Sequence, residues 1–284
     1  MLKVKSVSKS YHRRKVLFEC SFTCEPYQIM GIFGHNGCGK STLFRIICGI
    51  IKPDSGAVIV EKDKVGYMPE QRSLLIDLTL TQQAKMLGKL RNLNETQTEL
   101  SLQEMINTFG FGEMASKPIK TLSKGNQQKA QLILSMIHRP KVLILDEPFN
   151  GLDYLSQIEL SRWIRIYAQK GNSVLISSHQ LEHMDGLCDE ILILDHGKTI
   201  KQGHLQSLRE QHQQYSVKVN ADSNWKDFNF AYESLSAVDS WIEVRFTTLN
   251  QAKRAVGIFL KDKSVQSIHL EMVALSELIQ VCEH

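Results

Sequence analysis

A glycine-rich loop at residues 34–42 is the feature that most constrains the fold of this 284-residue chain. The loop matches the pattern G-x-x-x-x-G-K-[ST] in full, between an apolar, strand-like run at 29–33 and a helix-like run at 42–48. In such a strand–loop–helix unit, loop N–H groups and the helix N-terminus converge on one point, where they hold a polyphosphate. The loop comprises Gly34, His35, Asn36, Gly37, Cys38, Gly39, Lys40, Ser41 and Thr42.

Two side chains of the loop have distinct predicted roles. Lys40 supplies a positive charge for the β- and γ-phosphates of a nucleoside triphosphate, and the hydroxyl of Ser41 is a ligand for Mg²⁺. The glycines let the backbone curl around the anion because they carry no Cβ. The loop therefore predicts a site for a nucleotide triphosphate with Mg²⁺.

A second motif places two carboxylates at the end of a buried strand. The aliphatic run 142–145 is followed directly by Asp146 and Glu147, which is a Walker B arrangement. Ligands of open α/β folds bind at the carboxyl ends of the parallel strands. Asp146 is expected to hold Mg²⁺, and Glu147 to polarise the water that attacks the nucleotide.

The order of the remaining patterns predicts an α/β fold with a parallel core. Continuous aliphatic runs at 174–177 and 191–194 are typical of strands that are covered on both faces, and a helical stretch at 154–170 precedes them. Leu, Gln, Glu and Lys recur with helical spacing at 79–115, so we expect a helical insert at about 72–120.

The final part of the chain has a different character. Residues 205–284 hold 8 Lys and Arg against 10 Asp and Glu, so the basic excess of the chain lies before them. Strands are expected at 215–219, 242–246 and 265–270, and a last helix at 275–281. An apolar helix face is expected from Ala252, Val256, Phe259 and Leu260. We expect domains at 1–210 and 211–284, the second a small α+β module without catalytic groups.

Composition narrows the possible partners and compartment. A net charge of +4 is too small to indicate nucleic acid, so no nucleic-acid partner is expected. The N-terminus has no signal-peptide pattern, and no apolar run reaches the roughly 18 residues that a membrane span needs. The six cysteines do not have zinc-site spacing and favour reduced thiols in the cytosol. A membrane role would therefore need a separate chain.

Residues 1–204 resemble the nucleotide-binding subunit of ATP-binding cassette (ABC) transporters along their whole length. The segment Leu-Ser-Lys-Gly-Asn at 122–126 resembles the family's signature, usually LSGGQ, and 146–153 resembles Walker B running into the D-loop. The order and spacing of these elements are more specific than any one motif. Outside the phosphate loop, the matching residues are Tyr11, Gln71, Ser123, Gly125, Asn126, Asp146, Glu147, Asp153 and His179.

The resemblance implies a role for each matching residue. Tyr11 stacks on adenine, Gln71 of the Q-loop contacts Mg²⁺ or the attacking water, and His179 of the switch bonds to the γ-phosphate and Glu147. The signature and D-loop residues belong to the nucleotide-binding set; they are Ser123, Gly125, Asn126 and Asp153. Lys124 and Asn126 depart from the common signature.

The resemblance also implies an assembly. Two cassettes stack head-to-tail, as a homo- or heterodimer, so that Ser123 and Gly125 of one meet the γ-phosphate held by Lys40 of the other. The fold implied is a P-loop NTPase with a RecA-like core, an antiparallel β subdomain and an α-helical subdomain, followed by the C-terminal α+β module. The function implied is ATP hydrolysis that powers a separate transmembrane permease at the cytoplasmic face of the plasma membrane.

Export is favoured because residues 272–279 resemble the ending of cassettes from bacterial drug, peptide or ion exporters. A soluble cassette ATPase without a membrane partner, acting in translation, on DNA or in cluster assembly, is the alternative. The chain has one nucleotide domain and a short insert, whereas translation cassettes have two domains and DNA-repair cassettes have a long coiled-coil insertion.

Overall fold

The chain divides into two units, Met1–Leu205 and Gln206–His284. The computed structural model describes residues 1–12, 14–204, 207–208, 214–221, 232, 234–238, 241–262 and 264–273. The division lies close to the boundary that the sequence predicts after residue 210.

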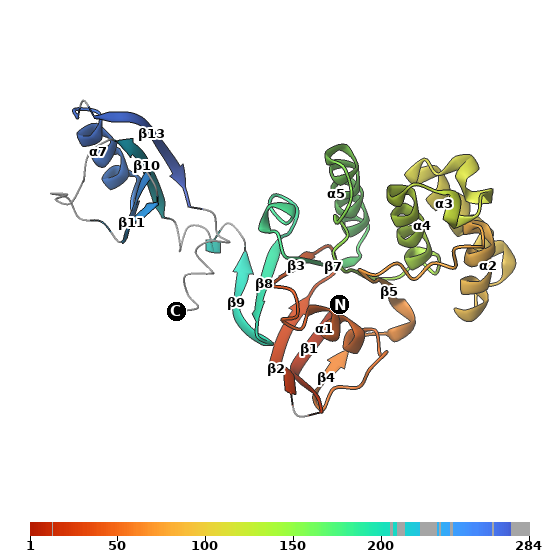
Figure 1. The fold of residues 1–284 in the computed structure, drawn as a ribbon. Helices are drawn as coiled ribbons and strands as arrows, with labels where there is room; N and C mark the ends of the chain where they lie inside the picture. The colour runs from red at the N-terminus through yellow and green to blue at the C-terminus, as the bar shows by residue number, and fades with distance from the viewer. Residues whose placement is uncertain are drawn as a thin grey trace. The chain divides into compact units, whose positions relative to one another are not determined.

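A nine-stranded sheet organises the first unit (Figure 1). Its strands are β1 (Leu2–Tyr11), β2 (Arg14–Cys24), β3 (Ile29–Phe33), β4 (Ser55–Ile59), β5 (Val65–Met68), β6 (Val142–Leu145), β7 (Ser173–Ser178), β8 (Glu190–Asp195) and β9 (Lys198–His204). Their order is β4-β1-β2-β9-β8-β3-β7-β6-β5, with β3, β5, β6, β7 and β8 parallel. The strand that feeds the glycine loop, β3, therefore lies between β7 and β8, and the strand that ends at Asp146, β6, is next to β7.

Helices bury both faces of the parallel strands. Helix α1 (Lys40–Ile47) belongs to the core on one face, and α4 (Lys124–Met136) and α5 (Tyr154–Gln169) to the core on the other. Strand β6 shows why the aliphatic run is continuous: Val142 and Ile144 pack into the first core, whereas Leu143 and Leu145 pack into the second.

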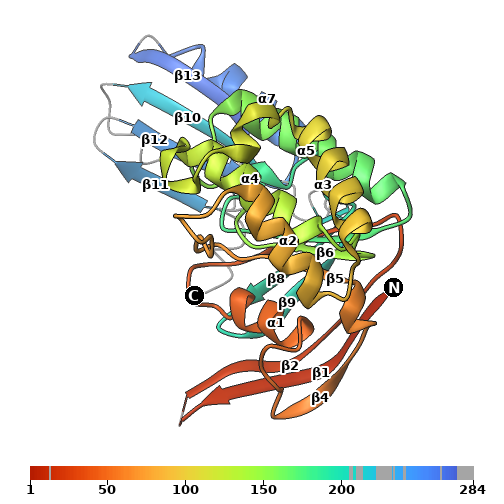
Figure 2. The same cartoon turned by 90° about the vertical axis from the view of Figure 1, so that its right-hand side faces the viewer.

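The expected insert is helical and lies beside α4 (Figure 2). Thr79 and Asn94 each form a reciprocal capping box at the start of a helix, and Gly110 ends the second helix in the left-handed conformation. The elements of this region are α2 (Leu80–Leu90), α3 (Glu95–Phe109), η2 (Gly112–Ser116) and η3 (Ile119–Thr121); η1 (Lys62–Lys64) and η4 (Leu181–His183) lie outside it.

Strands β1, β2 and β4 form an antiparallel arm on the parallel sheet. A single residue pair, Phe18 with Lys198, joins β2 to β9, and the Phe18 N–H donates to the Gly197 oxygen at 2.8 Å. Backbone pairing thus joins β2 to β9 at one point, and buried side chains of the arm pack in one core with α1 and the parallel strands.

The second unit is a small α+β fold. Its antiparallel sheet has the order β11-β12-β10-β13 and packs on one helix. The elements are β10 (Tyr215–Ala221), β11 (Ser234–Val238), β12 (Trp241–Phe246), α7 (Leu249–Phe259) and β13 (Val265–Met272). The expected helix face is wrong at one position: Leu260 follows the last turn of α7 and is 70% exposed, whereas Ala255 is buried. The helix predicted at 275–281 lies outside the described residues.

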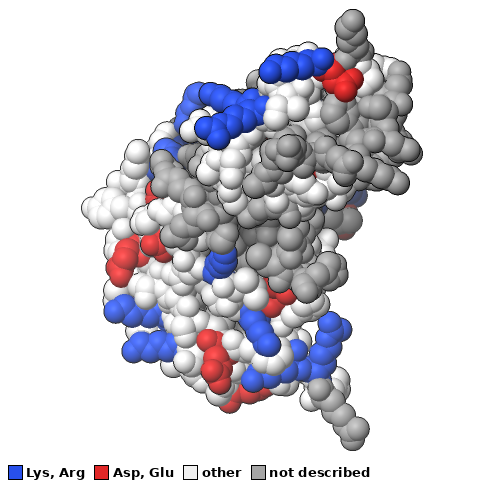
Figure 3. Space-filling model, turned by 90° about the vertical axis from the view of Figure 1, so that its left-hand side faces the viewer, with Lys and Arg blue, Asp and Glu red and all other residues white. Residues whose placement is uncertain are grey.

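The surface carries both signs of charge. On the face drawn in Figure 3, described Lys and Arg side chains occur together with Asp, Glu and many neutral residues. No helix in the described part of the chain combines the length and apolar character needed to cross a membrane.

Candidate nucleotide site

Two glycines give the loop before α1 its shape. Gly39 has a φ of 115°, and a Cβ there would lie 2.9 Å from both the Val16 oxygen and a Leu17 methyl carbon. Gly37 has a φ of 85°, which is also in the region that L side chains rarely adopt. The loop therefore curls tightly against β2, and the N-terminus of α1 opens into a cavity of about 200 Å³.

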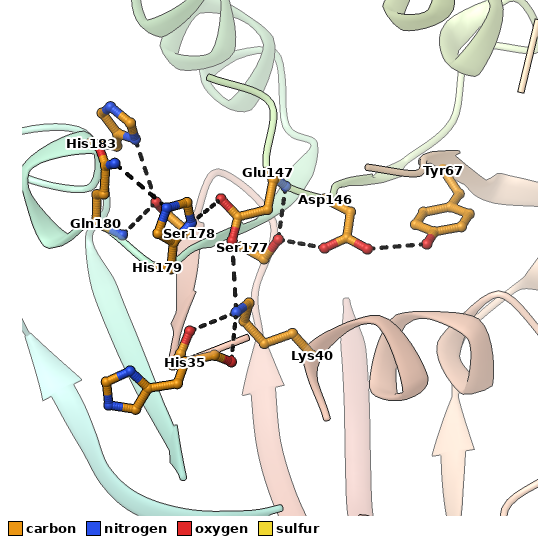
Figure 4. A network of polar contacts seen from close by, with 11 residues as sticks. His35, Lys40, Tyr67, Asp146, Glu147, Ser177, Ser178, His179, Gln180 and His183 are labelled. Atoms are coloured by element: carbon orange, nitrogen blue, oxygen red, sulfur yellow. Dashed lines mark hydrogen bonds and ion pairs between the residues drawn. The ribbon is translucent and has the colours of Figure 1, made fainter. Parts of the chain in front are cut away.

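Lys40 is buried within this loop and bonds to its backbone (Figure 4). Its Nζ donates to the carbonyl oxygens of Gly34 at 2.6 Å and His35 at 3.2 Å. The same ammonium lies 3.6 Å from Oε1 of Glu147. The two carbonyl groups hold the ammonium at the cavity wall, where its charge is suited to binding a phosphate oxygen.

The two carboxylates after β6 are also buried, and they point in different directions (Figure 4). Asp146 accepts hydrogen bonds from the hydroxyls of Ser177, at 2.6 Å, and Tyr67, at 3.3 Å. Burial, followed by the charge of Asp146, raises the pKa of Tyr67, so the phenol keeps its proton and donates it to the carboxylate. Asp146 is therefore held by two hydroxyl groups from neighbouring strands.

The side chain of Glu147 bridges the phosphate loop and His179. Its Oε2 lies 3.0 Å from Nδ1 of His179, as the sequence predicts for this pair. Its Oε1 is buried and has no hydrogen-bond partner among the described residues, with the Lys40 ammonium 3.6 Å away. A buried carboxylate oxygen without a partner retains a full lone pair for a water or a metal-bound group.

Most of the loop residues predicted from the sequence line this cavity together. An acidic side chain that the sequence analysis did not assign, Glu70, lines it as well, whereas the adjacent Gln71 is exposed and is not in the lining of the described cavity. The Gln71 carbonyl instead accepts a hydrogen bond from Gln131 at 3.4 Å. The lining comprises Val16, Asn36, Gly37, Gly39, Lys40, Ser41, Thr42, Glu70, Asp146 and Glu147.

The other loop residues shape the site from outside its lining. Gly34 packs so closely that a Cβ would lie 2.2 Å from the Leu194 oxygen, and its carbonyl accepts from Lys40. Cys38 is buried, and burial raises the pKa of its thiol, which therefore stays protonated and packs as a small apolar group.

Five predicted residues lie apart from this cavity. Ser123 caps α4 by accepting from the Asn126 N–H at 3.3 Å, and Asp153 caps α5 by accepting from the Ser156 N–H at 2.9 Å, which lowers the pKa of Asp153. Tyr11 is 41% exposed at the end of β1, with the Lys9 ammonium 5.9 Å from its ring centre. These five are Tyr11, Ser123, Gly125, Asn126 and Asp153. His179 and His35 are also absent from the lining, as is Gln71, but His179 bonds to Glu147 and the His35 carbonyl accepts from Lys40, and both of those partners line the cavity.

Comparison with known proteins identifies the family of the chain. The family model described as ABC transporter matches residues 17–150. An uncharacterized ABC transporter ATP-binding protein of Methanocaldococcus jannaschii is 39% identical over 207 residues, which are 73% of this chain and 79% of that protein. The chain belongs to the ABC transporter ATP-binding proteins.

Two further comparisons agree with this ABC family assignment. A lantibiotic transport ATP-binding protein of Streptococcus pyogenes is 32% identical over 208 residues, covering 70% of this chain and 89% of that protein. A solved structure of an ATP-binding subunit of an ABC transporter superposes with a TM-score of 0.69 at 29% identity, covering 74% of this chain and 92% of its own. The RecA-like cassette fold predicted from the sequence is confirmed.

As an ABC ATP-binding protein, the chain binds ATP and is an ATPase. The residues present also fit Mg²⁺. Ser41 and Asp146 both line the cavity and offer hydroxyl and carboxylate oxygens, the ligand types that Mg²⁺ takes alongside substrate phosphates. Among the described residues, no group of three His, Cys, Asp or Glu side chains gathers as a metal site.

Proposed function

We propose that this ABC ATP-binding protein powers a separate transmembrane permease, as a peripheral subunit at the cytoplasmic face of the plasma membrane. The observation that carries the proposal is a cavity of about 410 Å³ between the sheet and the helical insert. Its wall on α2 is apolar, and Met86 and Leu90 there are 48% and 76% exposed. Exposed apolar side chains around a groove are typical of a site that receives an amphipathic helix.

The wall of this groove connects it to the nucleotide site. Tyr67, which bonds to Asp146, and Pro69, next to Glu70, line the groove. A helix of the permease in the groove would therefore contact the strand that leads directly to the nucleotide cavity. This supports coupling between ATP hydrolysis and movement of the partner.

We propose the following roles in hydrolysis. Lys40 binds the β- and γ-phosphates, and Ser41 and Asp146 hold Mg²⁺, which neutralises phosphate charge when bound. Glu147 accepts a proton from the attacking water at Oε1, the oxygen that has no hydrogen-bond partner among the described residues. His179 holds Oε2 of Glu147 and faces the γ-phosphate.

We propose that two copies, or this chain and a related one, close head-to-tail around ATP. Gly125 supports this. It lies in the first turn of α4. An added Cβ would meet only Leu152, at 3.9 Å, among the described residues, so packing within the chain does not require glycine. Close approach of a group from another chain would require a glycine at this position.

Export is the direction that we propose. It rests on the resemblance of residues 272–279 to the ending of exporter cassettes, and only 272 and 273 of them are among the described residues. The name of the Streptococcus pyogenes relative refers to lantibiotic transport, which is compatible with a peptide substrate.

The C-terminal unit is proposed to regulate or dock rather than to catalyse. Its described core of valine, alanine and phenylalanine side chains is its own, and the ATP-site residues all lie between Tyr11 and His179. The fragment 1–210 should stay folded and bind ATP with the affinity of the full chain, measured by calorimetry, while transport by the assembled system should change. Unfolding of the fragment, or unchanged transport, would contradict this role.

Capture of the partner tests the main proposal. Tagged protein should retrieve one polytopic membrane protein from native membranes, and Leu90→Glu should abolish that capture without weakening ATP binding. Leu100→Glu is the matched control, because Leu100 is 63% exposed on α3 and outside the groove. Recovery of a ribosomal, DNA-bound or other soluble complex in place of a membrane protein would favour the soluble alternative.

A further inference from the structure

A single buried hydroxyl connects the two carboxylates of the site. Ser177 lies on β7 and has no exposed surface. Its Oγ donates to Oδ1 of Asp146 at 2.6 Å and accepts the backbone N–H of Glu147 at 2.9 Å (Figure 4). A hydroxyl has one proton and two lone pairs, so both bonds are satisfied at once.

The backbone at Glu147 explains why this contact matters. Glu147 has a φ of 51°, a left-handed conformation that is strained for a residue with a Cβ. This turn sends the two side chains apart, Asp146 toward Tyr67 and Glu147 toward Lys40 and His179 (Figure 4). Glu147 is therefore both the residue with the strained backbone and the residue whose N–H bonds to Ser177.

Strand register brings Ser177 to this position. Leu145, the last residue of β6, pairs with Ile176 of β7. The residues that follow them, Asp146 after β6 and Ser177 on β7, therefore lie side by side. The neighbouring Ser178 makes different contacts, because its Oγ accepts the Gln180 N–H and lies 3.4 Å from Nδ1 of His183. Of these two adjacent serines, Ser177 is the one that bonds to the carboxylate pair.

We propose that Ser177 is a positioning residue that sets the orientation of the Mg²⁺-binding Asp146 relative to the general base Glu147. The inference rests on the roles proposed above for those two residues. Removing the hydroxyl would free Asp146 to rotate and would leave the Glu147 N–H without its partner. Both the metal-dependent part of nucleotide binding and the chemical step would then weaken together.

The test compares Ser177→Ala with Ser173→Ala. Ser173 is a matched control, because it is buried on the same strand and its hydroxyl donates to the Glu25 oxygen at 2.9 Å, far from the carboxylates. Binding of a non-hydrolysable ATP analogue is measured by calorimetry with Mg²⁺ and with EDTA. Ser177→Ala should lose about 10-fold of the Mg²⁺-dependent gain in affinity and keep its affinity in EDTA, whereas Ser173→Ala should keep both.

Kinetics complete the test. The kcat of Ser177→Ala should fall about 10- to 100-fold, and Ser177→Thr should restore it. In a Glu147→Gln background, Ser177→Ala should lower kcat by a smaller factor than in the parent, because the general base is already absent and only the orientation of Asp146 is lost. Normal kcat in Glu147→Gln itself would refute the role of Glu147 rather than that of Ser177.

Two results would overturn the proposal. The first is an equal loss of affinity with Mg²⁺ and in EDTA, which would show a structural role alone. The second is unchanged Mg²⁺ dependence and kcat in Ser177→Ala. If that variant does not fold, Ser177→Cys fills the same space with a weaker hydrogen-bonding group, and the same two measurements decide.

Discussion

The N-termini of α1 and α4 are both expected to bind anions, but their surroundings differ. The first is enclosed by the glycine loop, with buried Lys40 and the two carboxylates around one cavity. The second is capped by an exposed Ser123, has no acidic residue in its first turn, and is not part of the described cavity. We propose that one chain supplies the groups for hydrolysis, and that its α4 terminus acts on nucleotide held by another chain.

The largest effect is expected when the base at the enclosed site is removed. Glu147→Gln should slow ATP hydrolysis by about 10²-fold or more, the contribution typical of a positioned general base, while ATP binding persists. Because hydrolysis ends the closed state, the variant should accumulate as an ATP-bound dimer in size-exclusion chromatography with Mg-ATP. Unchanged turnover would remove Glu147 from the mechanism.

A change at the open terminus should block assembly without emptying the enclosed site. Gly125→Asp places a carboxylate where the γ-phosphate of the opposing chain is expected, and like charges across an interface cost several kcal/mol. Hydrolysis should fall about 100-fold while the monomer binds ATP normally, as measured by calorimetry. Gly257→Asp is the control, because Gly257 is an exposed helical glycine of α7 with open space around it. Equal hydrolysis in both variants would mean that one chain suffices.

The third effect falls on binding at the enclosed site. Lys40→Ala removes a charge-assisted contact worth about 1.5–3 kcal/mol, so the dissociation constant for ATP should rise about 10- to 150-fold. Lys170→Ala, at an exposed lysine after α5, is the matched control and should bind as the parent does. If Lys40→Ala binds and hydrolyses ATP normally, the site at the N-terminus of α1 is not the one that holds the nucleotide.

The smallest effect separates two neighbours on the cavity wall. Glu70 lines the cavity and Gln71 does not, so Glu70→Ala should lower the Mg²⁺-dependent gain in ATP affinity about 10-fold, in the range of groups that support a metal site. Gln71→Ala should remain close to the parent in the same titration. The opposite ranking would support the role that the sequence predicts for Gln71.

Local patterns predicted much of the fold from the sequence. The strand predicted at 142–145 has those same limits in the structure, because an aliphatic run buried on both faces leaves little choice of register. The orientation of side chains in the loop after β5 could not be predicted in the same way. Which of Glu70 and Gln71 faces the cavity depends on backbone turns that side-chain type does not encode.

Contacts between distant strands could not be predicted. Ser177 lies beside Asp146 because β6 and β7 pair in one register, and a hydroxyl in a buried run has no sequence signal for that contact. Leu260 was instead predicted to be on the buried face of a helix, and this prediction was wrong. Its hydrophobicity suggested the helix face, but the helix ends one residue earlier and leaves it exposed.

The single-pair connection between β2 and β9 means that backbone hydrogen bonds contribute little to holding the antiparallel arm on the core sheet. Because so little of the backbone is paired there, side-chain packing holds the arm: Leu17 and Cys20 of β2 are buried in the same cluster as Phe44 of α1. The arm also contacts the glycine loop, since the Val16 oxygen closely abuts Gly39, and Val16 lines the cavity. A nucleotide in the cavity would therefore lie against both β2 and the start of α1, two elements that share one buried core.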